Sequence, residues 1–299
     1  MPSAPPTFER LVPLEDDVLL TLSGAGGAKL LQGQASADFT STSYPSAVEG
    51  VFCDTKGRVI ADFLALMLSP EEILLRVSAS VAPILCAALD KYLPFFRVTL
   101  EESEHSVWGG FCQPDNSQPD LTEPSAEVPA APAVVATEFG VAIQRSASHW
   151  ELFAINKAPV DAMSPSDGQW QCDAIKRSEA RVLAPTSGLY LPQDLNYDLR
   201  GLINFKKGCY TGQEIVARLH WRGTPKRRLQ LARLSEGNLP MPGTALIDSH
   251  SEQRVGSVIN AAPCDSGILL AIEATDVALS SGCHLADQST ELHPISSSL

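Results

Sequence analysis

Lys207-Gly208-Cys209-Tyr210-Thr211-Gly212-Gln213-Glu214 is the most unusual stretch of the chain. Its cysteine follows two lysines and stands between glycines, which allow the tight backbone of an exposed turn. Nearby ammonium groups stabilise a thiolate, and a helix that begins at Gln213 would add the partial charge of its first amides. The pattern therefore predicts a reactive thiol at Cys209 with Lys207 beside it. The alternative is a structural cysteine buried in a turn.

Positive charge gathers around this stretch, although the chain as a whole is acidic. The chain contains 22 Lys and Arg residues against 35 Asp and Glu residues, a net charge of −13 at pH 7. Between Arg200 and Arg233, however, nine basic residues stand against one acid, Glu214. The net charge opposes wrapping by nucleic acid, so we expect no stable nucleic-acid complex. We expect an anionic ligand to bind in this basic segment. The alternative is that the segment is only a solvated strand edge.

Length and composition indicate a soluble globular protein with one large fold or two domains. The 299 residues are 44% hydrophobic and 19% charged, whereas a disordered chain would carry fewer apolar and more charged side chains. The apolar runs are too short to cross a bilayer, so we expect no membrane partner. Residues 1–20 show neither an export nor a transit pattern, which predicts a cytoplasmic location.

The cysteines predict neither a disulfide framework nor a metal site. Seven cysteines stand far apart in the sequence, at positions 53, 86, 112, 172, 209, 264 and 283. An odd number without any C-x-x-C or H-x-x-x-H pair argues against disulfides and against zinc or iron–sulfur ligation. We therefore expect no bound metal, and we expect most thiols other than Cys209 to be small core residues.

Local patterns outline a first α+β unit over residues 1–112. Residues 17–23 are predicted to form a strand that leads into a glycine-opened helix. The turn Asp54-Thr55-Lys56-Gly57 precedes the apolar run Val59–Leu68, which is typical of a hairpin. Apolar residues recur at spacings of three and four from Val81 to Tyr92, which indicates an amphipathic helix. Strands mixed with helices favour an α+β layer over a purely parallel sheet.

The rest of the chain divides into three parts. Residues 113–138 carry five prolines among polar residues, so we expect an exposed loop or linker. Residues 139–222 are predicted to form a second α+β unit that carries the cysteine motif. Residues 223–299 contain short strand candidates parted by turn residues, which predict a small β-barrel or sandwich. We expect the end of this part, residues 284–299, to be frayed.

Several stretches together resemble a known family. The K-G-C-Y-T-G-Q-E string is similar to the signature of the YgfZ-type folate-binding proteins, relatives of the glycine-cleavage aminomethyltransferase, or T-protein. Supporting stretches are Leu30-Leu31-Gln32-Gly33-Gln34, Asp54-Thr55-Lys56-Gly57-Arg58-Val59, Leu191-Pro192-Gln193-Asp194-Leu195-Asn196, and Trp221-Arg222-Gly223 with Lys226-Arg227-Arg228-Leu229. The resemblance extends over most of the chain.

The resemblance implies both a fold and a role. It implies two α+β units, ferredoxin-like, and a C-terminal β-barrel arranged as a three-part ring, with tetrahydrofolate or a derivative in a central pocket. It also implies an accessory protein that supports the assembly or repair of iron–sulfur enzymes, including tRNA-modifying ones. The expected partners are therefore folate and iron–sulfur client enzymes or assembly factors.

Five residues suit a folate ligand. A carboxylate accepts the two parallel N–H donors of a pterin edge, and the candidates are Asp194 and Glu179. Asp194 stands where T-proteins have a pterin-binding glutamate. Trp170 matches a tryptophan that lines the folate site of YgfZ-type relatives, and its alternative role is a core residue. Arg218 or Arg222 would meet the glutamate tail of the folate.

Departures from the family pattern bear on catalysis. T-proteins carry paired aspartates where this chain has only Asp62, which we expect to face solvent, and Arg181 replaces a glycine. Two alternatives stay open. A folate-dependent aminomethyl transferase would turn over a one-carbon donor, although the cysteine signature is foreign to T-proteins. A non-catalytic adaptor for acidic proteins or RNA would show salt-dependent binding without folate.

Overall fold

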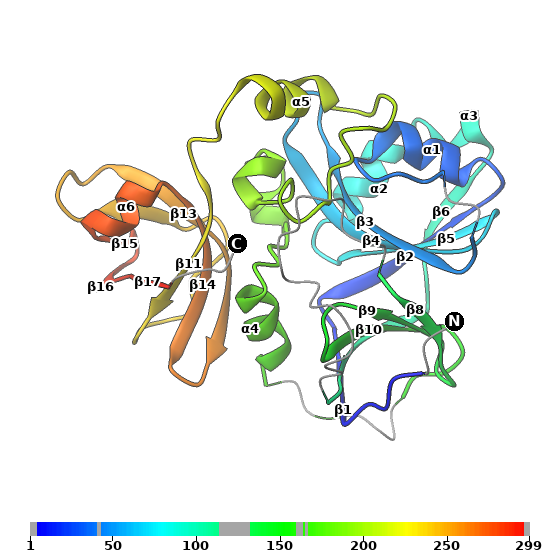
Figure 1. Cartoon of the computed structure of the whole chain (residues 1–299), viewed down its shortest axis with the longest axis horizontal. Coiled ribbons are helices and arrows are strands. Elements are labelled where there is room, and N and C mark those ends of the chain that lie inside the picture. The colour runs from blue at the N-terminus through cyan, green and yellow to red at the C-terminus, as the bar shows by residue number, and fades with distance from the viewer. Residues whose placement is uncertain (1–4, 41–42, 114–131, 160–163, 165–166, 296–299) are drawn as a thin grey trace.

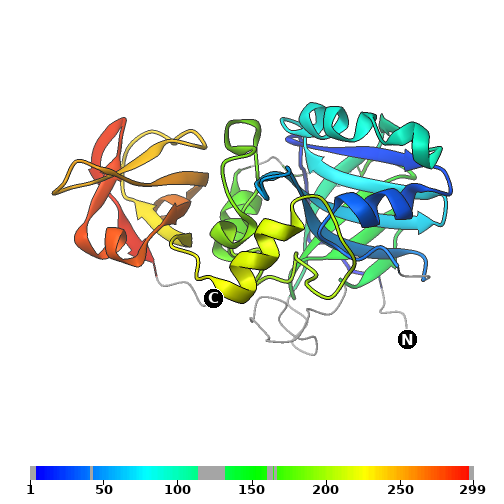
Figure 2. The same ribbon diagram turned by 90° about the horizontal axis from the view of Figure 1, so that it is seen from above.

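The structure is a computed structural model that describes residues 5–40, 43–113, 132–159, 164 and 167–295. The strands form two five-stranded sheets and one seven-stranded sheet (Figure 1). The two five-stranded sheets make up one end of the molecule and the seven-stranded sheet makes up the other. Helices α4 (Gln169–Lys176) and α5 (Gln213–Arg222) lie between these ends in both views (Figure 2).

The N-terminal sheet contains the strands with the clearest local signals. Its spatial order is β3 (Ser46–Cys53), β4 (Val59–Ser69), β5 (Glu72–Ser78), β2 (Asp17–Ser23) and β6 (Thr99–Glu102). All neighbouring strands are antiparallel. The predicted hairpin is confirmed as the β3–β4 connection, in which the amide of Gly57 donates to the carbonyl of Asp54 at 3.0 Å. The strand predicted over residues 17–23 is confirmed as β2.

This sheet is buried on both faces. Leu20 and Leu75 belong to one core cluster with apolar residues of helices, whereas their neighbours Leu19 and Leu74 belong to another cluster with the middle sheet. This separation follows from the alternation of side chains along a strand. The helices of the unit are α1 (Gly27–Gln34), α2 (Ala82–Asp90) and α3 (Leu93–Phe96). Among the described residues, no helix has the length and apolar character needed to span a bilayer.

The middle sheet combines strands from both sides of residue 112. Its spatial order is β1 (Arg10–Pro13), β7 (Ser106–Phe111), β10 (His149–Ala154), β9 (Val141–Gln144) and β8 (Val134–Ala136). The boundary expected at 112 therefore falls inside one sheet. Part of the segment expected to be a linker over 113–138 forms β8 at the sheet edge, and residues 114–131 lie outside the described residues.

The seven-stranded C-terminal sheet is curved into a nearly closed, barrel-like form. Its spatial order is β16 (Gln288–Glu291), β15 (Cys283–Leu285), β12 (Ala245–Asp248), β13 (Arg254–Cys264), β14 (Gly267–Ala274), β11 (Arg228–Leu234) and β17 (His293–Ile295), with α6 (Asp276–Ser281) after β14. The expectation of a frayed tail over residues 284–299 is wrong for residues 284–295, because β17 pairs with β11 and extends the sheet; residues 296–299 lie outside the described residues.

A disulfide fastens α4 to the barrel. Cys172 on α4 and Cys264 at the end of β13 are bonded, with their Cα atoms 5.9 Å apart. The expectation that the chain forms no disulfide is therefore wrong. The two cysteines stand 92 positions apart in the sequence, and only the packing of α4 against β13 brings them together. The other five cysteines are free.

Candidate functional site

The cysteine motif forms a loop that is anchored to the end of α1. We call residues 204–212 the signature loop, which leads directly into α5. The ammonium of Lys207 donates a hydrogen bond to the carbonyl of Ala35 at 2.8 Å and another to the carbonyl of Ala37. Burial lowers the pKa of Lys207 to about 8, while the carboxylate of Asp38 opposes this shift. The structure thus gives Lys207 an anchoring role.

Further polar contacts connect the signature loop and the residues just before it with the end of α1. The hydroxyl of Thr211 donates to Oε1 of Gln34 at 2.9 Å. The hydroxyl of Ser36 donates to the carbonyl of Leu202 at 2.7 Å and accepts from the amide of Val51 at 2.9 Å. The Leu30–Gln34 stretch and the residues after it therefore support the loop directly.

A close backbone contact joins the signature loop to the β3–β4 turn. Gly212 has a φ of +84° and Gly57 a φ of +73°, in the region that favours glycine. A Cβ atom on Gly212 would lie 2.6 Å from the carbonyl oxygen of Asp54 and 3.0 Å from the Cα of Gly57. Only glycine fits at position 212 without a shift of backbone, which explains the second glycine of the motif.

A 3-10 turn, Pro192–Leu195, supports α5 and the first barrel strand. The side-chain amide of Gln193 donates to the carbonyl of Val216 on α5 at 2.8 Å. The amide of Asn196 donates to the carbonyl of Leu229 at 3.1 Å, at the start of β11. The sequence stretches that resemble the family therefore meet around the signature loop and α5, although they lie far apart in the chain.

These contacts leave Cys209 at the surface. Cys209 is exposed, whereas the other free cysteines are buried or half-buried. Burial raises the pKa of Cys112 and of Cys283 to about 11, so these thiols carry little thiolate at neutral pH. Burial also raises the pKa of Cys53, which lies under the signature loop. An electrophile or a sulfur atom of another protein therefore reaches Cys209 most readily.

The remaining motif residues divide between surface and interior. Gly208 and Glu214 are exposed, and Gln213 is the first residue of α5, as predicted. Tyr210 is buried, and burial raises its pKa. Its ring lies 5.5 Å from the ammonium of Lys207. Tyr210 therefore holds the loop from inside while Cys209 faces out.

Asp194 is a half-buried carboxylate with one oxygen available. Its Oδ2 accepts the amide of Leu191 at 2.8 Å, and its Oδ1 forms no hydrogen bond with the described residues. Burial raises the pKa of Asp194, against the opposing effects of the Leu191 amide and the charges of Arg58 and Arg227. A ligand that donates N–H groups to this carboxylate would compensate for its loss of water.

Glu179 is surrounded by arginines. Its carboxylate forms ion pairs with Arg177 at 3.2 Å, Arg145 at 3.3 Å and Arg200 at 3.4 Å. Burial alone would raise the pKa of Glu179, but the charges of these arginines outweigh it and hold the pKa well below its usual range. Both carboxylate oxygens are engaged, so Glu179 is not free in this structure to accept a pterin edge.

Trp170 lies in the core between α4 and the middle sheet. Its exposed fraction is 8%, and its ring meets Phe111 edge to face at a centroid distance of 5.7 Å. A Cβ atom on Gly109 would lie 2.5 Å from the indole, so Gly109 makes room for the ring. The guanidinium of Arg177 lies 5.7 Å from the ring and links Trp170 to Glu179. No hydrogen bond or ion pair in the described part of the chain joins this pair to Asp194.

Comparison with known proteins places the chain in a family. It is 30% identical over 282 residues to the tRNA-modifying protein YgfZ of Cronobacter sakazakii. This alignment covers 87% of this chain and 83% of that protein. It is 29% identical to the protein of the same name from Shigella dysenteriae, over 95% of this chain and 91% of that one. The chain belongs to the YgfZ family. A scan against protein-family models found no match.

The fold of this YgfZ family member is similar to that of a T-protein. The aminomethyltransferase T of the glycine cleavage system from Bartonella henselae matches with a TM-score of 0.65. The match covers 97% of this chain and 86% of the other at 15% sequence identity, which establishes a likeness of fold only.

A buried ion-pair network occupies the region where Glu179 lies, and it was not predicted. Arg76 donates two hydrogen bonds of 2.9 Å to Glu151, and Arg145 pairs with Glu49, Glu151 and Glu179. These side chains come from both five-stranded sheets and from the segment after α4. In several of these ion pairs the two residues stand 75 or more positions apart in the sequence, so no local sequence pattern reveals the pairs.

The network also accounts for two departures from the family pattern. Asp62 is 5% exposed rather than facing solvent, so that expectation is wrong. Arg181, which replaces a glycine, donates to Asp62 at 2.7 Å and pairs with Asp17 at 2.7 Å. Arg181 thus adds a cation between Asp17 and Asp62, of which Asp62 also pairs with Arg76 at 3.6 Å.

The other predicted cations and the surface pocket lie apart from this network. Arg218 and Arg222 are exposed on α5 and form no ion pair with the described residues.

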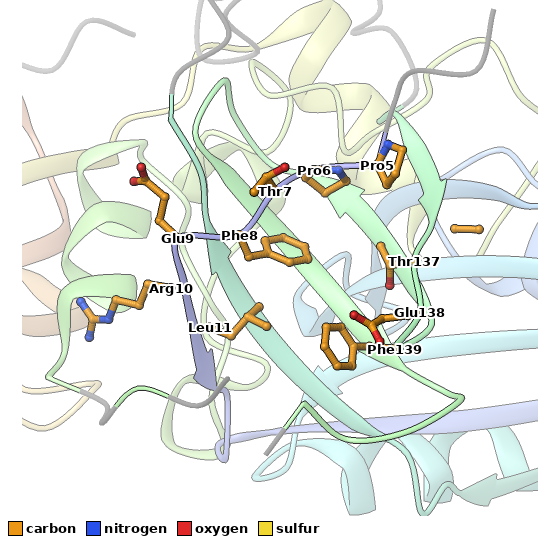
Figure 3. A pocket seen from close by; sticks show the side chains of 11 residues that line it. Pro5, Pro6, Thr7, Phe8, Glu9, Arg10, Leu11, Thr137, Glu138 and Phe139 are labelled. Carbon is orange, nitrogen blue, oxygen red and sulfur yellow. The ribbon is translucent and has the colours of Figure 1, made fainter. Parts of the chain in front are cut away.

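A pocket of about 740 Å³ opens between residues 5–11 and residues 136–139 at the edge of the middle sheet (Figure 3). Phe8, Leu11 and Phe139 give it an apolar wall, and none of the predicted site residues lines it.

Proposed function

We propose that this protein is a folate-binding accessory factor for iron–sulfur enzymes, including tRNA-modifying ones, and that Cys209 is its reactive group. The observation that carries the proposal is the exposed Cys209, presented by a loop that the Leu30–Gln34 and Asp54–Val59 stretches contact directly. Membership of the YgfZ family and the likeness to a T-protein support the role and the ligand. The proposal includes a three-part ring of two ferredoxin-like units and the barrel, with iron–sulfur client enzymes or assembly factors as partners.

Asp194 is the carboxylate that fits a pterin. It is half-buried, its Oδ1 forms no hydrogen bond with the described residues, and it lies within the electrostatic reach of Arg58 and Arg227. Glu179 fits less well because its oxygens are taken by arginines. Arg218 and Arg222, which the sequence suggested for the tail, extend along the exposed side of α5. Trp170 contacts Arg177, which pairs with Glu179, so Trp170 would act on a ligand only near Glu179.

The aminomethyl-transfer alternative receives no support from Asp62. Its Oδ2 accepts from Arg181 at 2.7 Å, and its Oδ1 accepts from the amide of Val182 at 2.6 Å. A carboxylate engaged on both oxygens is not available as a general base in this structure.

Titration calorimetry with tetrahydrofolate tests the ligand. We expect binding by the parent protein and at least about tenfold weaker binding by Asp194→Asn, because a charged hydrogen-bond partner is lost. Asp265→Asn, a change of an exposed aspartate in the β13–β14 turn, should bind like the parent. Equal affinities of Asp194→Asn and the parent would remove Asp194 from the site, and absence of binding by the parent would refute the folate proposal.

Complementation tests the cellular role. In cells that lack their own YgfZ-family protein, the parent gene should restore the activity of an iron–sulfur tRNA-modifying enzyme. Cys209→Ser should restore little activity while keeping the fold and the folate affinity. Cys86→Ser, which changes a half-buried cysteine on α2, should restore as much as the parent. Failure of the parent gene would contradict the proposed role.

A further inference from the structure

The outer side of α5 exposes an aromatic and basic surface. Arg218, Trp221 and Arg222 stand at helical spacings of three and four, so they share one face. Trp221 is 70% exposed, whereas the other three tryptophans are 8% exposed or less. We define the α5 face as Lys206, Arg218, His220, Trp221, Arg222 and Lys226, all of which are exposed. The helix lies at the periphery of the molecule in both views (Figures 1 and 2).

A stack of rings holds Trp221 in place. Phe205 of the signature loop stacks on His220 at a centroid distance of 3.7 Å and an interplanar angle of 12°. Trp221 meets His220 edge to face at 4.6 Å and 81°. These contacts fix one edge of the indole while most of its surface stays in water. The indole thereby presents a flat face on which another planar group can stack.

The cations around the indole form no ion pair in the part of the chain that the structure describes. They are Arg218, Arg222, Lys206 and Lys226. The one acid of α5, Glu214, stands one turn before Arg218. Elsewhere the arginines of this chain are largely committed to carboxylates, as in the network around Glu179. Within a chain of net charge −13, the α5 face is thus a local cationic surface that attracts an anionic partner.

We propose that the α5 face binds a single-stranded segment of RNA, with a base stacked on Trp221 and phosphates against the four cations. Unpaired bases stack on exposed aromatic rings while Lys and Arg side chains follow the backbone. An acidic protein segment would use the cations, but the side chains of Asp and Glu offer no flat face for the indole. Every nucleotide of RNA carries both a base and a phosphate, so RNA fits the whole surface better. Because the net charge opposes nucleic acid, we expect a weak, transient complex.

This inference extends the proposed tRNA-related role, yet its test contains neither folate nor an iron–sulfur enzyme. The experiment titrates the full chain with a twelve-nucleotide oligouridylate and follows tryptophan emission. Because the other indoles are buried, a change in emission on binding comes mainly from Trp221. We expect quenching with a Kd on the order of 10 to 100 µM at physiological salt. A logarithmic plot of affinity against salt should have a slope of about −3, for four phosphate contacts.

Substitutions separate stacking from charge. Binding by the variants is measured from the fluorescence anisotropy of a labelled oligonucleotide. Trp221→Ala should bind the oligonucleotide about tenfold more weakly than the parent, and Trp221→Tyr should recover most of the affinity. Arg218→Gln with Arg222→Gln should reduce the salt slope by about 1.4. Phe95→Ala is the matched control, because Phe95 is 83% exposed on α3 near Lys91 and Arg97, and it should bind like the parent.

Three outcomes would overturn the inference. The first is no binding by the parent at millimolar oligonucleotide, and the second is equal weakening by Phe95→Ala and Trp221→Ala. The third is unchanged affinity of Trp221→Ala together with full competition by polyglutamate of the same charge, which would reveal a site for acidic chains. Circular dichroism and thermal unfolding of each variant check that the protein remains folded, and the buried Val216, which none of the variants changes, anchors α5.

Discussion

Gly212 packs against Gly57 so closely that a methyl group on Gly212 would lie 3.0 Å from the Cα of Gly57. This contact joins the cysteine motif to a turn more than 150 positions earlier in the chain. Both glycines adopt positive φ values, so the contact depends on two turns that other residues would not form without strain. The position of Cys209 therefore depends on backbone geometry in the N-terminal sheet.

Gly212→Ala should destabilise the protein more than a change at a comparable open glycine. Gly188 has a similar φ of +75°, but a Cβ atom there meets nothing within 4 Å. Gly188→Ala should cost about 1 kcal/mol of unfolding free energy from backbone strain alone. Gly212→Ala should cost a further 1 to 3 kcal/mol or so, because the methyl group collides with backbone. Urea denaturation measures both, and equal losses would contradict the contact.

Glu179→Gln should destabilise the protein by about 3 kcal/mol or more at pH 7, because buried arginines lose their carboxylate partner. The arginines hold the pKa of Glu179 below its value in the unfolded chain, so its stabilisation is complete above the unfolded pKa and lost as pH falls through the acid range. The difference in stability between parent and variant should therefore shrink from about pH 5 to pH 3. Denaturation across this range checks the trend, and Glu214→Gln, at an exposed site, should show no such change.

Reduction of the Cys172–Cys264 disulfide should lower the unfolding free energy by up to about 4 kcal/mol, since the bond closes a long loop. The double variant Cys172→Ser with Cys264→Ser should be as stable as the reduced parent and insensitive to dithiothreitol. Denaturation with and without reductant gives both values. Seven titratable thiols in the oxidised, unfolded parent would show that the bond does not form.

Local patterns predicted the elements that depend on neighbouring residues. The strand over residues 17–23, the hairpin at Asp54–Gly57 and the helix within Val81–Tyr92 follow from alternation, turn chemistry and helical spacing. The family-like stretches also drew attention to Cys209, which the structure places at the surface. These features could be read from the sequence because their physical causes lie within a few residues of each other.

Features that depend on distant residues could not be predicted in this way. The pairing of β7 with β10 crosses the expected boundary at 112, and the ion pair of Arg76 with Glu151 joins two different sheets. Glu179 looked like a ligand carboxylate because the arginines that engage it, such as Arg145, are distant in the sequence. Burial and partner choice are set by tertiary packing, which single-sequence patterns do not encode.

The most direct measurement is the order in which the native cysteines are alkylated. Substoichiometric iodoacetamide at pH 7.5, without reductant, followed by peptide mass spectrometry, gives the modified fraction of each thiol. We expect Cys209 to be labelled first, because it is exposed while burial raises the pKa of Cys86 and Cys112. Gly212→Ala should change the labelling rate of Cys209 and leave that of Cys112 unaltered. Earlier labelling of Cys86 or Cys112 than of Cys209 in the parent would contradict the presentation of Cys209 by the signature loop.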